Sequence, residues 1–162
     1  MSTYVKLANT FKDDPELHDF WMGMARHEAA HVGALDLLAV MIEQAETTPR
    51  PPRIAAGAAA AAATIERLHE EADQPMTVAR AFDLAVELES SEVEDLVFDL
   101  FAMLANPDER DQAEQMLVHD LSALSLMIEK HTDDDALLAR ADALVERHID
   151  RREARKPASG TA

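Results

Sequence analysis

A helical stripe between Met22 and Ile42 limits the folds open to this chain. Its members recur every three or four positions and are apolar except at the centre: Met24, Glu28, His31, Leu35, Leu38 and Ile42. This spacing predicts a helix with one face in a core. A buried carboxylate is costly unless it is paired, protonated or bound to a metal. The central Glu28 and His31 are therefore either a hydrogen-bonded pair in an ordinary helical bundle or a pair of metal ligands.

Composition narrows the class of protein further. The chain has 162 residues, rich in alanine, leucine, aspartate and glutamate, with only four glycines, which favours an all-α fold. We expect one domain over residues 1–150 and a flexible basic and polar tail over 151–162. The formal net charge of −17 argues against nucleic acid as a partner. The absence of cysteine excludes disulfides, thiolate catalysis and cysteine-ligated metal centres, and is compatible with a cytoplasmic location. No apolar run is long enough to cross a membrane, and the first residues do not resemble a signal peptide.

Prolines and capping residues divide the chain into predicted helices. Asp14 and Pro15 have the residue types of an N-cap and a first helical residue. The helix that they begin should reach about Ala45. The other predicted helices are Tyr4–Phe11, an alanine-rich segment Arg53–Ala72, Thr77–Leu104, Asp108–Lys130, and a last one from Asp133–Asp135 to about Arg152. The breaks between them fall at Thr47–Pro52, Gln74–Pro75 and Asn106–Pro107.

A weak internal repeat relates two parts of the chain. Pro15 and Pro107 are 92 positions apart, and the same offset pairs Met24 with Met116, His27 with His119, and Glu28 with Asp120. A shared register of this kind is typical of a duplicated helical hairpin. The repeat predicts that Glu28 and Asp120 face each other.

The segments Tyr4-x-x-Leu7-Ala8, Asp14-Pro15-Glu16-Leu17 and Met24-Ala25-x-x-Glu28-x-x-His31 resemble the second half of the first hairpin of the ferritin-like superfamily, in its rubrerythrin-like branch. Ala81–Glu89 resembles the third core helix of that family. The resemblance covers roughly Tyr4–Met127 without the alanine-rich segment. It implies an antiparallel four-helix bundle with extra helices, and a di-iron site made by carboxylates and Glu-x-x-His pairs.

The resemblance implies a ligand set with departures from the family pattern. Glu28 and His31 match one Glu-x-x-His pair, Glu89 the lone glutamate of the third helix, and Asp120 the glutamate of the second pair. The second histidine is replaced by Ala123, and the first-helix glutamate would precede Met1. Glu92, His27 or His119 could compensate, although both histidines lie about 100° from the ligand stripe. A second subunit could also supply ligands in a homodimer or larger homo-oligomer.

His27–His31 also reads His-Glu-x-x-His, the zinc-binding motif of metallopeptidases. That interpretation remains an alternative, but no convincing substrate-binding strand accompanies the motif. The repeat pairs the segment with His119-Asp120-Leu121-Ser122-Ala123, which suits a helical bundle better than a peptidase.

The remaining polar and sulfur-containing residues suggest no further chemistry. Methionines such as Met116 and Met127 are expected to fill the core. His18, His69, His131 and His148 lie among charged residues, and we expect them to be solvated.

These observations lead to one functional expectation and one alternative. We expect a ferritin-like protein that binds metal, iron as a di-iron or single-ion site, with oxygen or peroxide as reactants. The absence of cysteine excludes a rubredoxin module, so redox cycling would need an external electron donor. The alternative is a metal-free helical interaction protein that retains the fold only.

Overall fold

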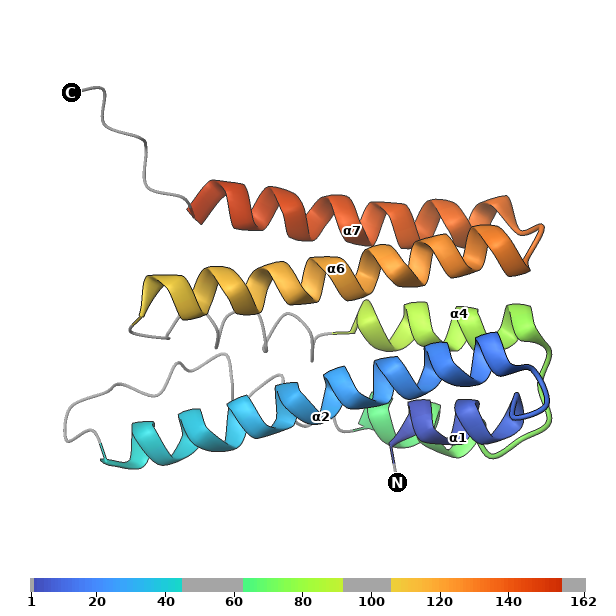
Figure 1. Cartoon of the computed structure of the whole chain (residues 1–162), viewed down its shortest axis with the longest axis horizontal. Helices are drawn as coiled ribbons and strands as arrows, with labels where there is room; N and C mark the ends of the chain where they lie inside the picture. Colours follow the sequence, from blue (N-terminus) through green and yellow to red (C-terminus); the bar gives the residue numbers. More distant parts are fainter. Residues whose placement is uncertain (1, 45–62, 92–105, 156–162) are drawn as a thin grey trace.

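All regular structure that the computed structural model describes is helical (Figure 1). It describes residues 2–44, 63–91 and 106–155, without the side chains at 31, 34–44 and 155. The helices are α1 (Thr3–Thr10), α2 (Pro15–Gln44), α4 (Val78–Glu89), α6 (Pro107–His131) and α7 (Asp135–Arg155), and residues 63–71 are helical as well. The predicted all-α class is confirmed. The predicted break at Thr47–Pro52, most of the alanine-rich segment and residues 92–104 lie outside the described parts.

Local capping explains where the helices begin. Asp14 Oδ1 accepts hydrogen bonds from the backbone N–H groups of Glu16 and Leu17, at 3.1 and 3.2 Å. Asn106 caps α6 in the same manner, with Pro107 in the first turn. These side chains satisfy amides that have no partner within the helix. The predicted starts of α2 and α6 are therefore confirmed to within a residue.

The end of α4 differs from the prediction of one helix over Thr77–Leu104. α4 ends at Glu89, and Ser90 and Ser91 form a turn in which the Ser91 N–H donates to the Leu88 carbonyl, 3.1 Å away. A bond that spans three residues tightens the last turn of a helix. Serine favours such endings because its side chain competes with the backbone for hydrogen bonds. Glu89 is therefore the last residue of its helix.

The helices pack mainly as antiparallel neighbours (Figure 1). α1 and α2 form one hairpin, and α6 and α7 form another, with α4 in contact with α6 and α7. α2 meets α6 at two levels, through Glu16 with Lys130 and through His27 with Asp120. Because low numbers on α2 pair with high numbers on α6, these two helices are antiparallel as well.

Aromatic rings join α1, α2 and α4 in the main core. Tyr4 and Trp21 stack with centroids 6.0 Å apart, and the Trp21 ring lies 5.0 Å from that of Phe82. Phe20 packs edge-on against Trp21 at 4.8 Å. Tyr4, Trp21 and Phe82 are almost completely buried. These ring contacts fix how α1, α2 and α4 lie against one another.

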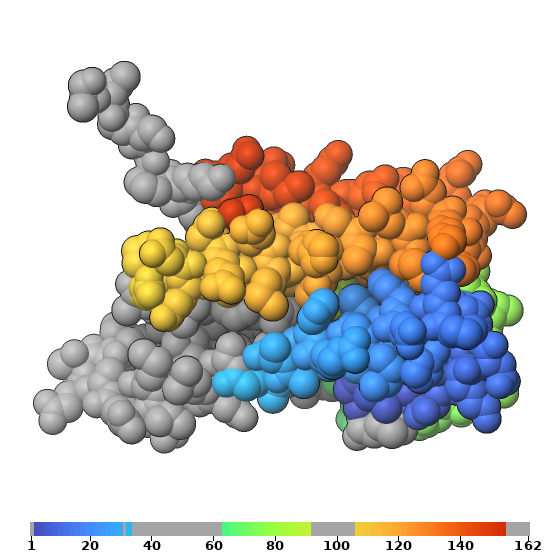
Figure 2. Space-filling view, viewed as in Figure 1, coloured from blue at the N-terminus to red at the C-terminus, as the bar shows by residue number. Residues whose placement is uncertain are grey.

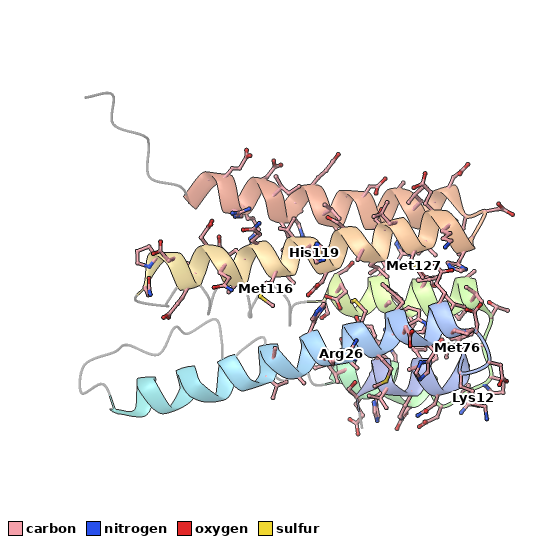
Figure 3. All side chains as sticks on the ribbon, in the orientation of Figure 1. Lys12, Arg26, Met76, Met116, His119 and Met127 are labelled. Atoms are coloured by element: carbon pink, nitrogen blue, oxygen red, sulfur yellow. The ribbon has the colours of Figure 1, made fainter. Side chains whose placement is uncertain are left out.

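Two expectations about individual side chains were wrong. His148, expected to be solvated, is 0% exposed, and its Nδ1 lies 2.9 Å from the Leu144 carbonyl oxygen. It lies in the α6–α7 hairpin, which has a small apolar core of its own around Leu117, Leu121 and Leu144. Met116, expected in the core, is 43% exposed; its side chain is labelled on α6 in Figure 3, and Figure 2 shows α6 from the same side in space-filling form. In both cases the helical period fixes the direction of a side chain around the axis of its own helix. It does not fix which neighbouring element, if any, covers that side chain.

The C-terminal helix extends into the predicted tail. α7 runs to Arg155, and the Arg152 guanidinium binds Asp111 Oδ1 of α6 at 2.8 Å. Residues 151–155 therefore belong to the folded hairpin, and 156–162 lie outside the described chain. Among the described helices, none is both long and apolar enough to cross a membrane.

Candidate metal site

Two predicted ligands, Glu28 and Asp120, lie near enough to a third, Glu89, for their charges to act on it, and each of the three comes from a different helix. Glu28 lies near the middle of α2, Glu89 ends α4, and Asp120 lies in α6. Glu89 and Asp120 are each 5% exposed, and Glu28 is half-buried. The carboxylates of Glu28 and Asp120 are close enough to Glu89 to affect its charge. The arrangement places three acidic groups around one part of the bundle interior.

Glu89 is the most deeply placed of the three acids. Its Oε1 accepts a hydrogen bond from the Tyr4 hydroxyl, which comes from α1. Burial raises the pKa of Glu89, the Tyr4 hydrogen bond lowers it, and the nearby carboxylates of Glu28 and Asp120 raise it further, to about 7. Desolvation and like charge both favour the protonated acid. Near neutral pH, Glu89 is therefore present in both its protonated and its ionised form.

Burial also raises the pKa of the other two acids. For Glu28, burial is the cause. For Asp120, burial raises the pKa, while His27 and His119 lower it because an imidazolium nearby favours the carboxylate. Asp120 Oδ2 is buried and has no hydrogen-bond partner. A buried carboxylate oxygen without a donor is an uncommon and unfavourable arrangement in a folded protein.

Among the predicted histidine ligands, only His27 directly contacts one of the three acids in the part of the chain that the structure describes. Its Nδ1 lies 2.7 Å from Asp120 Oδ1. His119 is exposed and affects Asp120 only through its charge. In Figure 3, His119 on α6 and Arg26 on α2 lie at about the same level along the bundle. The residues that follow them in sequence, Asp120 and His27, form the contact between these two helices.

Two predicted ligands cannot be placed. The side chain of His31 and the whole of Glu92 lie outside the described parts of the structure. Within those parts, no three His, Asp or Glu side chains form a group that could hold a metal ion on their own. Ala123, at the position of the missing histidine, is half-buried on α6 and has no ligating atom. The peptidase interpretation of His27–His31 stays a prediction, because it depends on His31.

Tyr4 was not predicted as part of the site. It was identified as a core residue of its helix, and the signal that could have revealed its role is a phenol on an otherwise apolar face. A buried tyrosine hydroxyl usually finds a polar partner. Here that partner is Glu89, 85 positions away in the sequence.

The chemistry of these donors fits a cation bound by oxygen ligands together with an imidazole nitrogen. Among the residues that the structure describes, no lysine or arginine is found against these three acids, and the side chain in direct contact with Asp120 is the imidazole of His27. A divalent ion would remove the repulsion among the carboxylates and complete the bonding of Asp120 Oδ2. Comparison of the chain with protein-family models, with curated proteins and with solved structures finds no match.

Proposed function

We propose that the protein binds a metal ion, iron in the first instance, between α2, α4 and α6, in a ferritin-like carboxylate site. The observation that supports this most directly is that Glu28 of α2 and Asp120 of α6 act through their charges on the buried Glu89 of α4. Three acids without a cation would repel one another in a poorly solvated interior. A metal ion is the simplest partner that turns this repulsion into bonding.

Glu28 and Glu89 would each bind through a carboxylate, and Asp120 would bind opposite them. Tyr4 would orient Glu89 through its hydroxyl, as residues behind metal ligands commonly do. His31 would supply a nitrogen from the same stripe as Glu28. The helix order and the antiparallel pairing of α2 with α6 are compatible with the proposed ferritin-like four-helix arrangement.

Bound iron would supply one-electron redox chemistry with oxygen or peroxide. The protein would contribute the carboxylates, the hydrogen bond that orients Glu89 and an apolar wall that limits water. Tyr4, which reaches Glu89, and Trp21, which stacks with Tyr4, would belong to that wall. Electrons would come from an external donor. A homo-oligomer remains part of the proposal, as a source of ligands that one chain lacks.

Metal titration of chelator-treated protein tests the proposal. Anaerobic Fe(II) is added, and bound iron is counted after desalting. We expect stoichiometric binding by the natural chain, and at least tenfold weaker binding by Glu28→Ala and by Asp120→Asn. Glu87→Gln is the matched control, because Glu87 lies on α4 two positions from Glu89 but pairs with Arg67 and Arg80 at the surface. Absence of iron after reconstitution would contradict the proposal.

Stability measurements provide an independent test through Glu28→Ala. If metal binds, the substitution should destabilise the iron-loaded protein, because ligand binding adds to native-state stability. Without metal it should leave stability unchanged or raise it, because one of three repelling charges is removed. A buried hydrogen-bonding role would instead predict the same loss, about 1–3 kcal/mol, with and without metal.

One observation favours the second candidate, a metal-free helical interaction protein. The described residues contain no group of three metal-ligating side chains. This candidate predicts that the midpoint of urea unfolding is the same with chelator and with Fe(II). A metal-dependent increase in that midpoint would exclude it.

A further inference from the structure

We propose that His27 is a nitrogen ligand of the metal site and binds the same ion as Asp120, which makes the site selective for transition metals. This inference rests on the proposed function and adds a residue that lies off the ligand stripe. It assigns to His27 the nitrogen that Ala123 cannot provide.

The contact between His27 and Asp120 is close but is not a hydrogen bond. Nδ1 and Oδ1 are 2.7 Å apart. Nevertheless Nδ1 is buried and has no hydrogen-bond partner, so the in-plane direction of the ring nitrogen does not point at the carboxylate oxygen. A hydrogen bond needs alignment as well as proximity, so the short distance between Nδ1 and Oδ1 does not by itself make one.

Two ligands of one ion show this combination of short distance and poor alignment. Metal–nitrogen and metal–oxygen bonds are each about 2.1 Å long. With ligand atoms 2.7 Å apart, the direction from nitrogen to the ion deviates by about 50° from the nitrogen–oxygen line. An N–H group of His27 that deviated so far from the line to Asp120 Oδ1 would make a poor hydrogen bond. A lone pair of the nitrogen and a lone pair of the oxygen could, however, both point at one metal ion between them.

The remaining oxygen of the same carboxylate supports a cation at this place. Asp120 Oδ2 is buried without a hydrogen-bond partner, and the residue is 5% exposed. The side chain of His27 is 40% exposed. The two facing ligand atoms are therefore buried, under an imidazole ring whose remaining atoms reach solvent.

A nitrogen ligand changes which ions the site prefers. Magnesium and calcium favour oxygen ligands, whereas imidazole suits iron, zinc, copper and nickel. Carboxylates alone would bind these classes with little discrimination. We therefore expect His27 to contribute selectivity for transition metals over magnesium, and not only affinity.

Pulsed electron paramagnetic resonance of the Mn²⁺-loaded chain tests the assignment. A directly bound imidazole gives a ¹⁴N modulation of the Mn²⁺ signal. The measurement is made in a His31→Gln background, so that His31 cannot be its source. We expect the modulation to persist in that background and to disappear when His27→Gln is added. His119→Gln added instead is the matched control, because His119 is exposed on α6 and lies next to Asp120 in sequence.

Rescue and competition measurements exclude a purely structural effect of the substitution. In the His31→Gln background, His27→Ala should regain the modulation when imidazole is supplied, and ¹⁵N-imidazole should change its frequency. His27→Gln should reduce the preference for Zn²⁺ over Mg²⁺ at least tenfold, whereas His119→Gln should leave it unchanged. Mn²⁺ binding without nitrogen modulation, or modulation that survives His27→Gln, would overturn this inference alone. No Mn²⁺ or Fe(II) binding to the natural chain would overturn the proposed function as well.

Discussion

Replacing Glu89 by glutamine should remove a large part of the pH dependence of folding in metal-free protein. In the native state burial raises the pKa of Glu89 from 4.5 to about 7, because the lowering effect of the Tyr4 hydrogen bond is outweighed by burial and by the nearby carboxylates of Glu28 and Asp120. The folded protein therefore binds this proton more tightly than the unfolded chain does. Its stability should fall as the pH rises from about 4.5 to 7, and then level off. A pKa change of this size corresponds to about 3 kcal/mol.

Glutamine has nearly the shape of the protonated acid and does not titrate. At pH 4 the free energies of unfolding of Glu89→Gln and of the natural protein should agree within about 1 kcal/mol. By pH 8 the variant should be the more stable by about 3 kcal/mol. Urea unfolding between pH 4 and 9, with a chelator present throughout, measures the difference. Groups far from Glu89 titrate alike in both proteins and cancel in the comparison, whereas the pKa values of Glu28 and Asp120 should fall in the variant because a neighbouring negative charge is removed.

The control variant for this experiment is Glu87→Gln. Although burial raises the pKa of Glu87, hydrogen bonds from Arg67 and Arg80 lower it by more, so that its pKa lies below 4.5. Its contribution to stability is present above pH 4.5 and is lost as the pH falls. Glu87→Gln should therefore lower stability at neutral pH and leave the fall between pH 4.5 and 7 in place. Parallel pH profiles for Glu89→Gln and the natural protein would refute the reasoning about Glu89.

Three further substitutions test the surroundings of the site. Tyr4→Phe removes the hydroxyl that donates to Glu89, so the pKa of Glu89 should rise further. The free energy of unfolding of metal-free protein at pH 8 should fall by about 1–3 kcal/mol. An unchanged titration of Glu89 in ¹³C carboxyl NMR would contradict the hydrogen bond. Phe82→Ala, in the fully buried aromatic cluster, should cost about 3–5 kcal/mol in urea unfolding, and a loss below 1 kcal/mol would mean that the cluster is not the core. Asp14→Ala removes the cap of α2 and should lower the free energy of unfolding by about 1 kcal/mol. The Fe(II) stoichiometry should not change. Loss of Fe(II) binding would show that the cap does more than begin a helix.

Short-range chemistry made much of the fold predictable. Asp14 with Pro15, and Asn106 with Pro107, mark the starts of two long helices, because capping depends on a few neighbouring atoms. The apolar side of α1, with Tyr4 buried, was likewise predictable from helical spacing. The end of α4 at Glu89 was not, since continuation of the helical pattern gave no hint of the turn at Ser90.

The sequence by itself determined an all-α chain and placed Glu89 and Asp120 on inward helical faces, but it did not identify the buried Glu114. Only the tertiary structure decided which side chains meet. Glu89 lies against Tyr4, and Asp120 against His27, through contacts between helices. The periodicity of a helix sets the direction of each side chain around its own axis to within a fraction of a turn. It does not specify which neighbouring helix that direction faces, and this depends on how all the helices bury their apolar surfaces together.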